Sequence, residues 1–415
     1  MTPVPESGWR VPGRVEVLGK HTDYAGGNVL VCAVGRGVTA RGTRRGDRAV
    51  VARSSAYADP VTLVPGGGEA LPNGHWGRYL QAVVDRFTTV FGPLDGADVV
   101  LDSDLPLASG MSSSSALLVA VALTWADAIG LSESEAWADL VGDDRLRLAS
   151  FLASVENGRG FGPLGEHSGV GTHGGSEDHV AMLCGRRGEL VEFGFAPTRE
   201  HRSVPWPDGW SLVVATSGVA AEKTGAAQAL YNRASLATQE ILDRWNSATG
   251  RDDATLADAV RTSPTAPSEL AGLVARDEFL SHRLEQFVVE SEVLVPAAVD
   301  ALAVGDLDAF ASAVTESQWL AETHLGNQVP QTSDLVTIAG DLGAKSASSF
   351  GAGFGGSVWA LVETGAAEGF AGNWLATYRR NFPDDGSRAS TLITVPSAPA
   401  ERLSCGFRDP GSGGL

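Results

Sequence analysis

Apolar positions recur with two different periods in the first third of the chain. Residues 10–61 contain short apolar runs separated by turns, and the turn at 25–27, AGG, lies between two such runs. This pattern predicts β-strands. From His75 to Phe91 the apolar and aromatic residues instead recur every three or four positions, which predicts a helix. Residues 97–101 predict the strand that follows it.

The pattern from residue 106 onward is mainly helical. Residues 106–157 begin with Ser and Gly and then become rich in Ala and Leu, whereas 158–175 contain eight glycines and no apolar periodicity. The first stretch predicts helices and the second a loop. The remaining predicted elements are a buried strand at 211–215, helices over 226–245 and 269–304, and a strand at 357–362 after a glycine-rich turn.

The length predicts two domains or one large two-layered unit, because 415 residues exceed one ordinary core. We place the boundary near residue 205, in the PWP stretch at 205–207, where a strand-rich half gives way to a helix-rich half. Residues 1–205 then form the N-terminal domain and 206–400 the C-terminal domain. The tail, 401–415, is predicted to be disordered because its end is rich in Pro, Gly and Ser.

Charge and cysteine content narrow the class of protein. The formal net charge of −19 disfavours binding to nucleic acid or to anionic membranes. Cys32, Cys184 and Cys405 are widely spaced and suggest neither disulfides nor a metal cluster. The sequence contains no signal-like N-terminal segment and no apolar stretch of about 20 residues, the length needed to span a bilayer. We therefore predict a soluble cytoplasmic protein.

A serine-rich loop leads directly into an apolar helix at residues 106–117, PLASGMSSSSAL. Gly110 permits close backbone approach, and a helix N-terminus concentrates unpaired N–H donors with a positive dipole. Hydroxyl groups come from Ser112, Ser113, Ser114 and Ser115. By itself the segment predicts either a phosphate cradle or a serine-capped helix start, and it is not a Walker A loop because no Lys follows the glycine.

Three segments together resemble one family. Residues 106–117 are similar to the Pro-x-Gly-x-Gly-Leu-Ser-Ser-Ser-Ala nucleotide-binding motif of the GHMP kinases, with Ala108 for one glycine and Met111 for the leucine. Residues 13–24, GRVEVLGKHTDY, resemble the galactokinase signature GRVNLIGEHTDY. Residues 351–356, GAGFGG, resemble the C-terminal glycine motif. The order and separations match those of the family, so the chain is identified as a member of the GHMP kinases that is similar to galactokinases.

The resemblance implies an α+β fold in two domains. The N-terminal domain would hold a mixed sheet with helices, the C-terminal domain an antiparallel sheet flanked by helices, and the active site would lie between them. The implied activity is that of a sugar 1-kinase, which phosphorylates the anomeric hydroxyl with ATP and Mg²⁺. Its partners would be a sugar and ATP, and a monomer or a dimer is equally open.

The resemblance also assigns residues to the sugar and to the chemistry. Residues 175–179, GSEDH, align with the family's Gly-Ile-Met-Asp-Gln and place Asp178 at the catalytic aspartate, with Arg14 as its cationic partner. In such a site Asp178 would accept the hydroxyl proton and Arg14 would keep Asp178 ionised. The implied sugar-binding residues are Lys20, His21, Asp23, Gly175 and Tyr231.

Further residues are implied for the nucleotide and the metal. The candidates for nucleotide binding beyond the serine loop are Trp76 and Tyr79 near adenine, Lys223 near the transferring phosphate, and Gly353. Ser114 and a glutamate would bind Mg²⁺, which prefers hard oxygen ligands. Glu156 closes a predicted helix where the family's metal carboxylate lies, whereas Glu166 keeps the usual spacing to the aspartate. We favour Glu156.

One departure from the signature bears on the substrate. Lys20 replaces the glutamate that resembles a ligand of the sugar's C6 hydroxyl, while Asp23 is kept. A cation with three donors in place of an acceptor favours an anionic or acceptor group at that end. We therefore expect a galactose-like sugar modified at or beyond C6, a hexuronate or an extended sugar. If Lys20 turns away from the sugar, galactose itself is the substrate.

Two other readings remain. A non-catalytic sensor of sugar and ATP would bind both ligands without turnover, although it need not retain Arg14 and Asp178. Another GHMP enzyme, such as a mevalonate or homoserine kinase, would act on a single alkyl alcohol. The polar stretch from Gly19 to Tyr24 favours a sugar with several hydroxyls instead.

Overall fold

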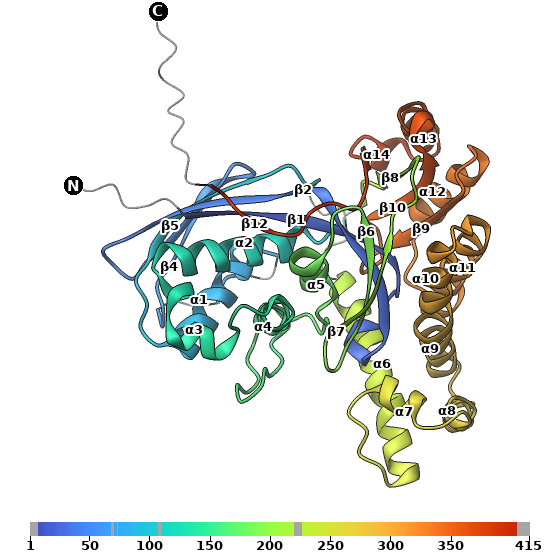
Figure 1. Cartoon of the computed structure of the whole chain (residues 1–415), viewed down its shortest axis with the longest axis horizontal. Helices are drawn as coiled ribbons and strands as arrows, with labels where there is room; N and C mark the ends of the chain where they lie inside the picture. The colour runs from blue at the N-terminus through green and yellow to red at the C-terminus, as the bar shows by residue number, and fades with distance from the viewer. Residues whose placement is uncertain (1–6, 68–69, 73, 107–109, 220–225, 405–415) are drawn as a thin grey trace, which may run out of the picture.

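Two β-sheets organise the chain in the computed structural model, which describes residues 7–67, 70–72, 74–106, 110–219 and 226–404 (Figure 1). In the described residues one sheet has eight strands and the other four. The larger sheet runs in the order β12-β1-β2-β5-β3-β4, and β6 pairs with β2 and β7. Its strands are β1 Ser7–Leu18, β2 Asn28–Arg44, β3 Val50–Ser54, β4 Tyr57–Leu63, β5 Ala97–Ser103, β6 Glu189–Gly194, β7 Arg199–Pro205 and β12 Glu401–Arg402.

The larger sheet is mixed, as predicted. β3 runs parallel to β5, while the other pairs in this sheet are antiparallel. The long β2 pairs with β1 along most of its length, with β6 near its start and with β5 near its end. β1 carries two register irregularities, one of them between Glu16 and Leu18. A bulge of this kind redirects the side chains that follow it.

Helices from the first half cover one face of this sheet (Figure 1). They are α1 Gly77–Phe91, α2 Ser113–Ala128, α3 Glu135–Leu140, α4 Arg145–Asn157 and α5 Glu177–Cys184, with short 3₁₀ turns η1 Asp23–Ala25 and η2 Leu131–Glu133. α2 is buried between the sheet and the other helices, and its side chains are accordingly apolar on nearly all sides. Phe87 of α1 packs against Trp125 of α2 and Phe151 of α4. These packed rings hold the C-terminal part of α2 against α1 and α4.

The smaller sheet is antiparallel, in the order β11-β8-β10-β9, as predicted for the second half. Its strands are β8 Trp210–Thr216, β9 Ser346–Phe350, β10 Ser357–Glu363 and β11 Thr391–Thr394. The surrounding helical elements are α6 Ala226–Thr249, α7 Leu256–Arg261, α8 Ala266–Val274, α9 Glu278–Val288, η3 Val289–Leu294, α10 Val295–Ala303, α11 Leu307–Leu320, η4 Ala321–Leu325, α12 Pro330–Asp341, η5 Thr364–Ala366, α13 Ala367–Asn381 and α14 Pro383–Gly386. The α+β class is therefore confirmed.

The stretch 269–304, predicted to be helical, is divided into several elements. Asp277 caps a new helix, because its side chain accepts a hydrogen bond from the backbone N–H of Leu280. The segment Val289–Leu294 is a π-helix, which widens the turn between α9 and α10. Short π-helical segments within α-helical stretches are frequent at functional sites. Among the described residues, no helix combines the length and apolarity needed to cross a membrane.

The prediction of a disordered tail is wrong for its first residues. Ser397 donates to the carbonyl of Ala33, Ala400 donates to the carbonyl of Met182, and Glu401–Arg402 pair with β1 as strand β12. The backbone hydrogen bonds along this edge of the sheet order the segment despite its composition. Residues 405–415 lie outside the described residues. Pro205 ends β7 and Trp210 begins β8, and the division into domains near residue 205 stays a prediction.

Candidate functional site

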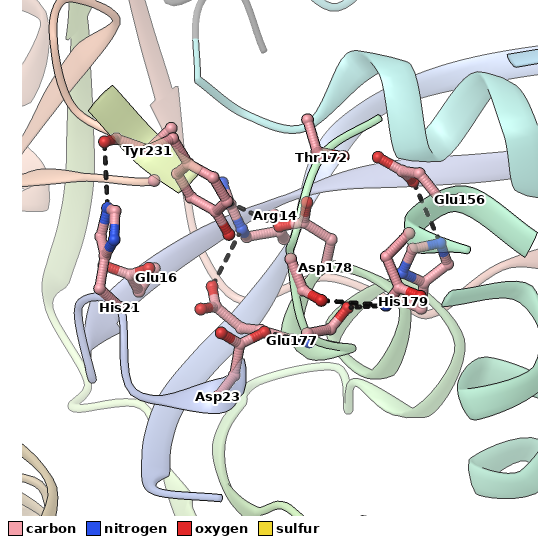
Figure 2. Close-up of a pocket in the computed structure, with 15 residues that line it drawn as sticks. Arg14, Glu16, His21, Asp23, Glu156, Thr172, Glu177, Asp178, His179 and Tyr231 are labelled. Atoms are coloured by element: carbon pink, nitrogen blue, oxygen red, sulfur yellow. Dashed lines mark hydrogen bonds and ion pairs between the residues drawn. The ribbon is translucent and has the colours of Figure 1, made fainter. Parts of the chain in front are cut away.

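Arg14 of β1 occupies the centre of a polar pocket. Its Nη2 lies 2.7 Å from Asp178 Oδ1 and its Nε lies 3.2 Å from Glu177 Oε1 (Figure 2). Its Nη1 donates to the carbonyl of Gly110 at 2.5 Å. Burial by itself would lower the pKa of the guanidinium, but the carboxylates of Asp178, Glu177 and Glu16 outweigh it and raise that pKa. Arg14 therefore stays charged and forms ion pairs with Glu177 and Asp178.

Asp178 lies at the N-terminus of α2. It belongs to the first turn of α5, and its Oδ2 accepts a hydrogen bond of 3.1 Å from Ser115 Oγ, in the first turn of α2. Ser112 precedes that helix with a φ of 55°, and its hydroxyl makes no hydrogen bond among the described residues. The first N–H groups of α2 are thus left for an anion beside the aspartate. Ser113 and Ser114 are partly exposed at the same helix start.

The third glycine-rich segment closes over Arg14 from the other sheet. Gly351 has a φ of 78°, and a Cβ added there would lie 2.9 Å from the Gly110 carbonyl and 3.4 Å from Arg14 Nη2. Only glycine permits this approach. The sequence segments that contain Arg14, Gly110 and Gly351, far apart along the chain, therefore meet at one place. Gly353, in contrast, packs against Asn327 and does not line the pocket.

Asp23, His21 and Tyr231 form the side of the pocket away from α2. Asp23 accepts hydrogen bonds from the backbone N–H groups of Tyr24, at 2.7 Å, and Glu177, at 3.1 Å. Burial raises the pKa of Asp23. Gly175 lies so close to Asp23 that an added Cβ would overlap its carboxylate. This contact explains why a glycine stands at that position.

His21 is a neutral group in the pocket wall. Its Nε2 lies 3.0 Å from the Ala352 carbonyl, which can only accept, so Nε2 carries the proton and Nδ1 accepts from the Tyr24 hydroxyl at 2.9 Å. Burial lowers the pKa of His21 to about 3, and the charges of Arg283 and Lys20 act in the same direction. The ring of Tyr231 packs on the imidazole, with centroids 4.9 Å apart. Tyr231 and His21 thus both present ring surfaces to the pocket.

The two candidate metal carboxylates lie in different cavities. Glu156, near the end of α4, lines the same pocket as Asp178, and its Oε2 lies 3.3 Å from Nε2 of His179. Glu166 lines a neighbouring cavity with His167 and His173, outside the pocket of Asp178. The geometry therefore favours Glu156 over Glu166.

Lys20 does not face the pocket, so the prediction that it binds the sugar is wrong and the hypothesis of a modified sugar loses its basis. Its Nζ donates to Ser317 Oγ at 2.7 Å, and Ser317 in turn donates to Glu290 Oε1 at 2.8 Å. The lysine is 1% exposed and is absent from the pocket lining. The irregularity after Glu16 and the turn at Gly19, with a φ of 106°, direct the side chain away from the sugar side. A buried carboxylate on η3, rather than a ligand, compensates its charge.

Glu16 and Glu177 form a buried carboxyl pair next to Arg14. Both side chains line the pocket, and both are buried. Burial raises the pKa of Glu16 to about 7, and Arg14 and Lys20 oppose this rise. Burial and the neighbouring Glu16 raise the pKa of Glu177 well above its usual range. The pair therefore holds its proton close to neutral pH.

The remaining candidates concern the adenine and phosphate. Trp76 is buried, and its ring stacks on Tyr57 with centroids 5.1 Å apart and planes 6° apart. Tyr79 is partly buried and packs against the hydrophobic core that contains Trp76. Neither lines the pocket of Asp178, so their contact with adenine stays a prediction. Lys223 lies outside the described residues.

Sequence reasoning missed several pocket residues. Glu16 stands two positions after Arg14 in a strand, where alternation puts both side chains on one face, and this signal could have revealed it. Thr172 and Asn157 also line the pocket, and Asn157 Nδ2 donates to the Gly174 carbonyl at 3.0 Å. These two positions carry no pattern that marks them in the sequence.

Comparison with known proteins agrees with this geometry. Three family models match the chain: the galactokinase galactose-binding signature at residues 2–44, the N-terminal domain of GHMP kinases at 78–157, and the C-terminal domain of GHMP kinases at 298–380. The galactokinases of Chloroflexus aggregans and Streptomyces coelicolor are each 29% identical to the chain, over 89% and 96% of its length and 87% and 95% of theirs.

Solved structures show the same fold. Lactococcus lactis galactokinase complexed with galactose superposes with a TM-score of 0.78 at 22% identity, over 96% of this chain and 95% of that one. L. major mevalonate kinase in complex with R-mevalonate gives 0.55 at 14% identity, over 94% and 96%. The chain thus belongs to the GHMP kinases, enzymes that use ATP. Within them it is a galactokinase-like sugar kinase, which transfers a phosphoryl group to a hydroxyl of its substrate.

The carboxyl pair makes stability depend on pH. The folded pKa of Glu16, about 7, exceeds its ordinary value of 4.5, so the folded protein binds this proton more tightly than the unfolded chain. The stabilisation is complete below about pH 4.5 and is lost as the pH rises through about 7. Glu16→Gln mimics the protonated form. We expect its melting temperature relative to the unaltered protein to rise between pH 5 and pH 8, as measured by thermal unfolding.

The matched control for that experiment is Glu192→Gln, which removes a buried glutamate paired with Arg202 on the neighbouring strands. This variant should gain no stability at pH 8, because it loses an ion pair. A Glu16→Gln protein that is as destabilised at pH 8 as at pH 5 would show that the pair does not hold the proton.

Because Lys20 is buried in an internal hydrogen-bonded network, its substitution should lower the stability of the protein. We expect Lys20→Met to lower the free energy of unfolding by about 3–5 kcal/mol, because Glu290 and Glu16 lose a buried cation. Lys345→Met is the control, since Lys345 pairs with the exposed Asp308 and should cost about 1 kcal/mol or less. Denaturant unfolding measures both. A Lys20→Met protein of unchanged stability but altered sugar preference would contradict the buried placement.

Proposed function

We propose that this chain is a galactokinase, which transfers the γ-phosphoryl group of ATP to the C1 hydroxyl of galactose. The observation that carries the proposal is the 2.7 Å ion pair between Arg14 and Asp178 beside the N-terminus of α2. A charged base next to a helix N-terminus suits an alcohol acceptor and an anionic donor. The relatives named galactokinase and the matching galactose-binding signature support galactose as the acceptor.

In the proposed reaction, Asp178 accepts the proton of the C1 hydroxyl. The O1–P bond forms as the bond from the γ-phosphorus to the bridging oxygen breaks, and the electron pair of that bond stays on the β-phosphate of ADP. Arg14 keeps Asp178 ionised and lies close enough to neutralise charge on the phosphoryl oxygens. The hydrogen bond from Ser115 fixes the direction of the carboxylate. Positioning of this kind supplies much of the catalysis in phosphoryl transfer.

The start of α2 would bind the phosphates. Its unpaired N–H groups, the hydroxyl of Ser112 and the close backbone approach allowed at Gly110 form a cradle for an anion. The donor set also fits Mg²⁺, because Ser114 and Glu156 offer the hard oxygen ligands that this ion prefers. When bound, the ion would neutralise charge on the β- and γ-phosphates.

Asp23, His21 and Tyr231 would orient the sugar. The Asp23 carboxylate uses two of its acceptor positions on backbone N–H groups and keeps others for hydroxyls of the sugar. The proposal replaces the hexuronate or extended sugar expected from Lys20, because that lysine has its partner in Ser317 and not in the pocket. Galactose carries an uncharged hydroxyl on C6, so its recognition needs no cation at that end.

Asp178→Asn tests the proposal. Removal of the base should lower kcat about 10²–10⁴-fold with ATP and galactose, while the affinity for galactose changes little. A coupled ADP-release assay measures the rate, calorimetry measures galactose binding, and ³¹P NMR identifies galactose 1-phosphate. Asp47→Asn, an exposed carboxylate paired with Arg45, is the control and should retain full activity.

Two results would overturn the proposal. One is an unaltered protein that binds ATP and galactose but forms no sugar phosphate, which would favour a sensor. The other is an Asp178→Asn enzyme with an unchanged kcat, which would require a different base.

A further inference from the structure

The pocket lining contains an imidazole to which the proposed reaction gives no role. His179 lies in the first turn of α5, directly after Asp178, and its side chain is 3% exposed. Figure 2 shows His179 to the right of Asp178 together with Glu156, whereas His21 and Tyr231 lie to the left. Both His179 and Glu156 line the pocket. This pair therefore borders the reaction site on the side away from the sugar-binding residues.

The imidazole of His179 approaches Glu156 without a hydrogen bond. Nε2 lies 3.3 Å from Oε2 of Glu156, yet neither ring nitrogen makes a hydrogen bond within the part of the chain that the structure describes. A protonated imidazole would direct an N–H at the carboxylate, which this geometry does not show. Buried polar groups of this kind commonly contact an ion or a water molecule. Adjacent ligands of an octahedral ion with bonds of about 2.1 Å lie about 3 Å apart, so the spacing fits joint coordination.

The Glu156–His179 pair lies next to the elements that form the phosphate cradle. α5 packs against both α2 and α4, and Ser115 of α2 donates to Asp178, the residue before His179. Glu156 lies in the last turn of α4. Among the residues that the structure describes, no group of three His, Cys, Asp or Glu side chains is placed to hold an ion by itself. An ion at the pair would take its other ligands from nucleotide phosphates, the Ser114 hydroxyl and water.

His179 also departs from the motif that surrounds the proposed base. The family motif has Gln at this position, which offers an amide oxygen, whereas histidine offers a ring nitrogen. Mg²⁺ prefers oxygen ligands. Imidazole suits first-row transition ions, which bind mixed nitrogen and oxygen sites increasingly tightly from Mn²⁺ to Cu²⁺. A nitrogen donor beside Glu156 therefore changes which divalent ion the site favours.

We propose that Glu156 and His179 together bind the divalent cation of the nucleotide, and that the imidazole shifts the preference of this site from Mg²⁺ toward first-row transition ions, for which Mn²⁺ is the probe. Nε2, which lies beside the carboxylate of Glu156, is the ligand atom. This inference rests on the proposed galactokinase function and concerns the metal of the same site. The roles of Asp178 and Arg14 are unchanged by it.

Pulsed EPR reads the coordination without turnover. In the unaltered protein with Mn²⁺ and ADP, electron spin echo envelope modulation should show an imidazole nitrogen coupled to the ion. Labelling the histidines with ¹⁵N separates this coupling from that of the adenine nitrogens of unlabelled ADP. His179→Gln, which restores the residue of the family motif, should abolish the coupling. His201→Gln, which removes an exposed histidine of β7 outside the pocket, is the control and should leave the coupling unchanged.

Affinity measurements test the preference between ions. Calorimetry in the presence of ADP gives the Kd of Mn²⁺ and of Mg²⁺ for the unaltered protein and for His179→Gln. Loss of the imidazole should weaken the binding of Mn²⁺ by about 10–100-fold, the range for residues that support a metal site, and should affect the binding of Mg²⁺ much less. In assays with ATP and galactose, the ratio of kcat/KM with Mn²⁺ to that with Mg²⁺ should fall in the same variant.

The outcomes separate this inference from the proposed function. If the unaltered protein shows no coupling from a histidine nitrogen, or if His179→Gln leaves the preference between Mn²⁺ and Mg²⁺ unchanged, the metal proposal is overturned. The imidazole would then only orient Glu156, and the galactokinase assignment would stand. Absence of sugar phosphate with either ion would overturn the assignment itself. The EPR measurement on the unaltered protein decides the proposal even where the variant fails to fold.

Discussion

The contacts of one buried guanidinium hold the site together. Arg14 extends from strand β1 of the larger sheet and contacts two further segments: the loop before α2 through Gly110, and the start of α5 through Glu177 and Asp178. The turn at Gly351, from the smaller sheet, closes over the same side chain. Without a charged group at this point, buried carboxylates from α5 would face one another and the start of α2 would lose its fixed position.

The surroundings of Arg14 show how the chain accommodates a high density of buried charge. On one side, Lys20, Ser317 and Glu290 form a hydrogen-bonded series that also satisfies the backbone N–H groups of Gly19 and Lys20. On the other side, the buried carboxyls of Glu16 and Glu177 line the pocket next to Arg14, and burial raises the pKa of both. The first arrangement is a closed internal network, whereas the second borders the pocket.

Much of the architecture could be predicted because it depends on local pattern and on motifs. The helical spacing from His75 to Phe91 corresponds to α1, and the glycine-rich stretch 158–175 contains no helix or strand of the structure. Motif order indicated that Arg14, Asp178 and the serine loop would meet, and they do. Strand β12 could not be predicted, since two residues at the edge of a sheet are held by backbone hydrogen bonds that leave no compositional signal.

The error about Lys20 has a specific physical cause. Strict alternation along β1 would place Arg14, Glu16 and Lys20 on one face, and the sequence offers no sign that it fails. The irregularity after Glu16 and the left-handed Gly19 break that alternation, so that Glu16 stays with Arg14 in the pocket while Lys20 turns toward η3.

The break in side-chain alternation along β1 means that the effect of the three departures from the family motifs on charge has to be considered together. Relative to Asn, Glu and Met, the residues Glu16, Lys20 and Glu177 keep the formal charge of the cluster at one negative charge. They redistribute it, however, because the added cation donates to Ser317, which in turn donates to Glu290, while the added carboxyls line the pocket. A substitution that looks like a charge reversal in the pocket is therefore, in three dimensions, part of a change that exchanges one carboxyl group in the pocket for two next to Arg14.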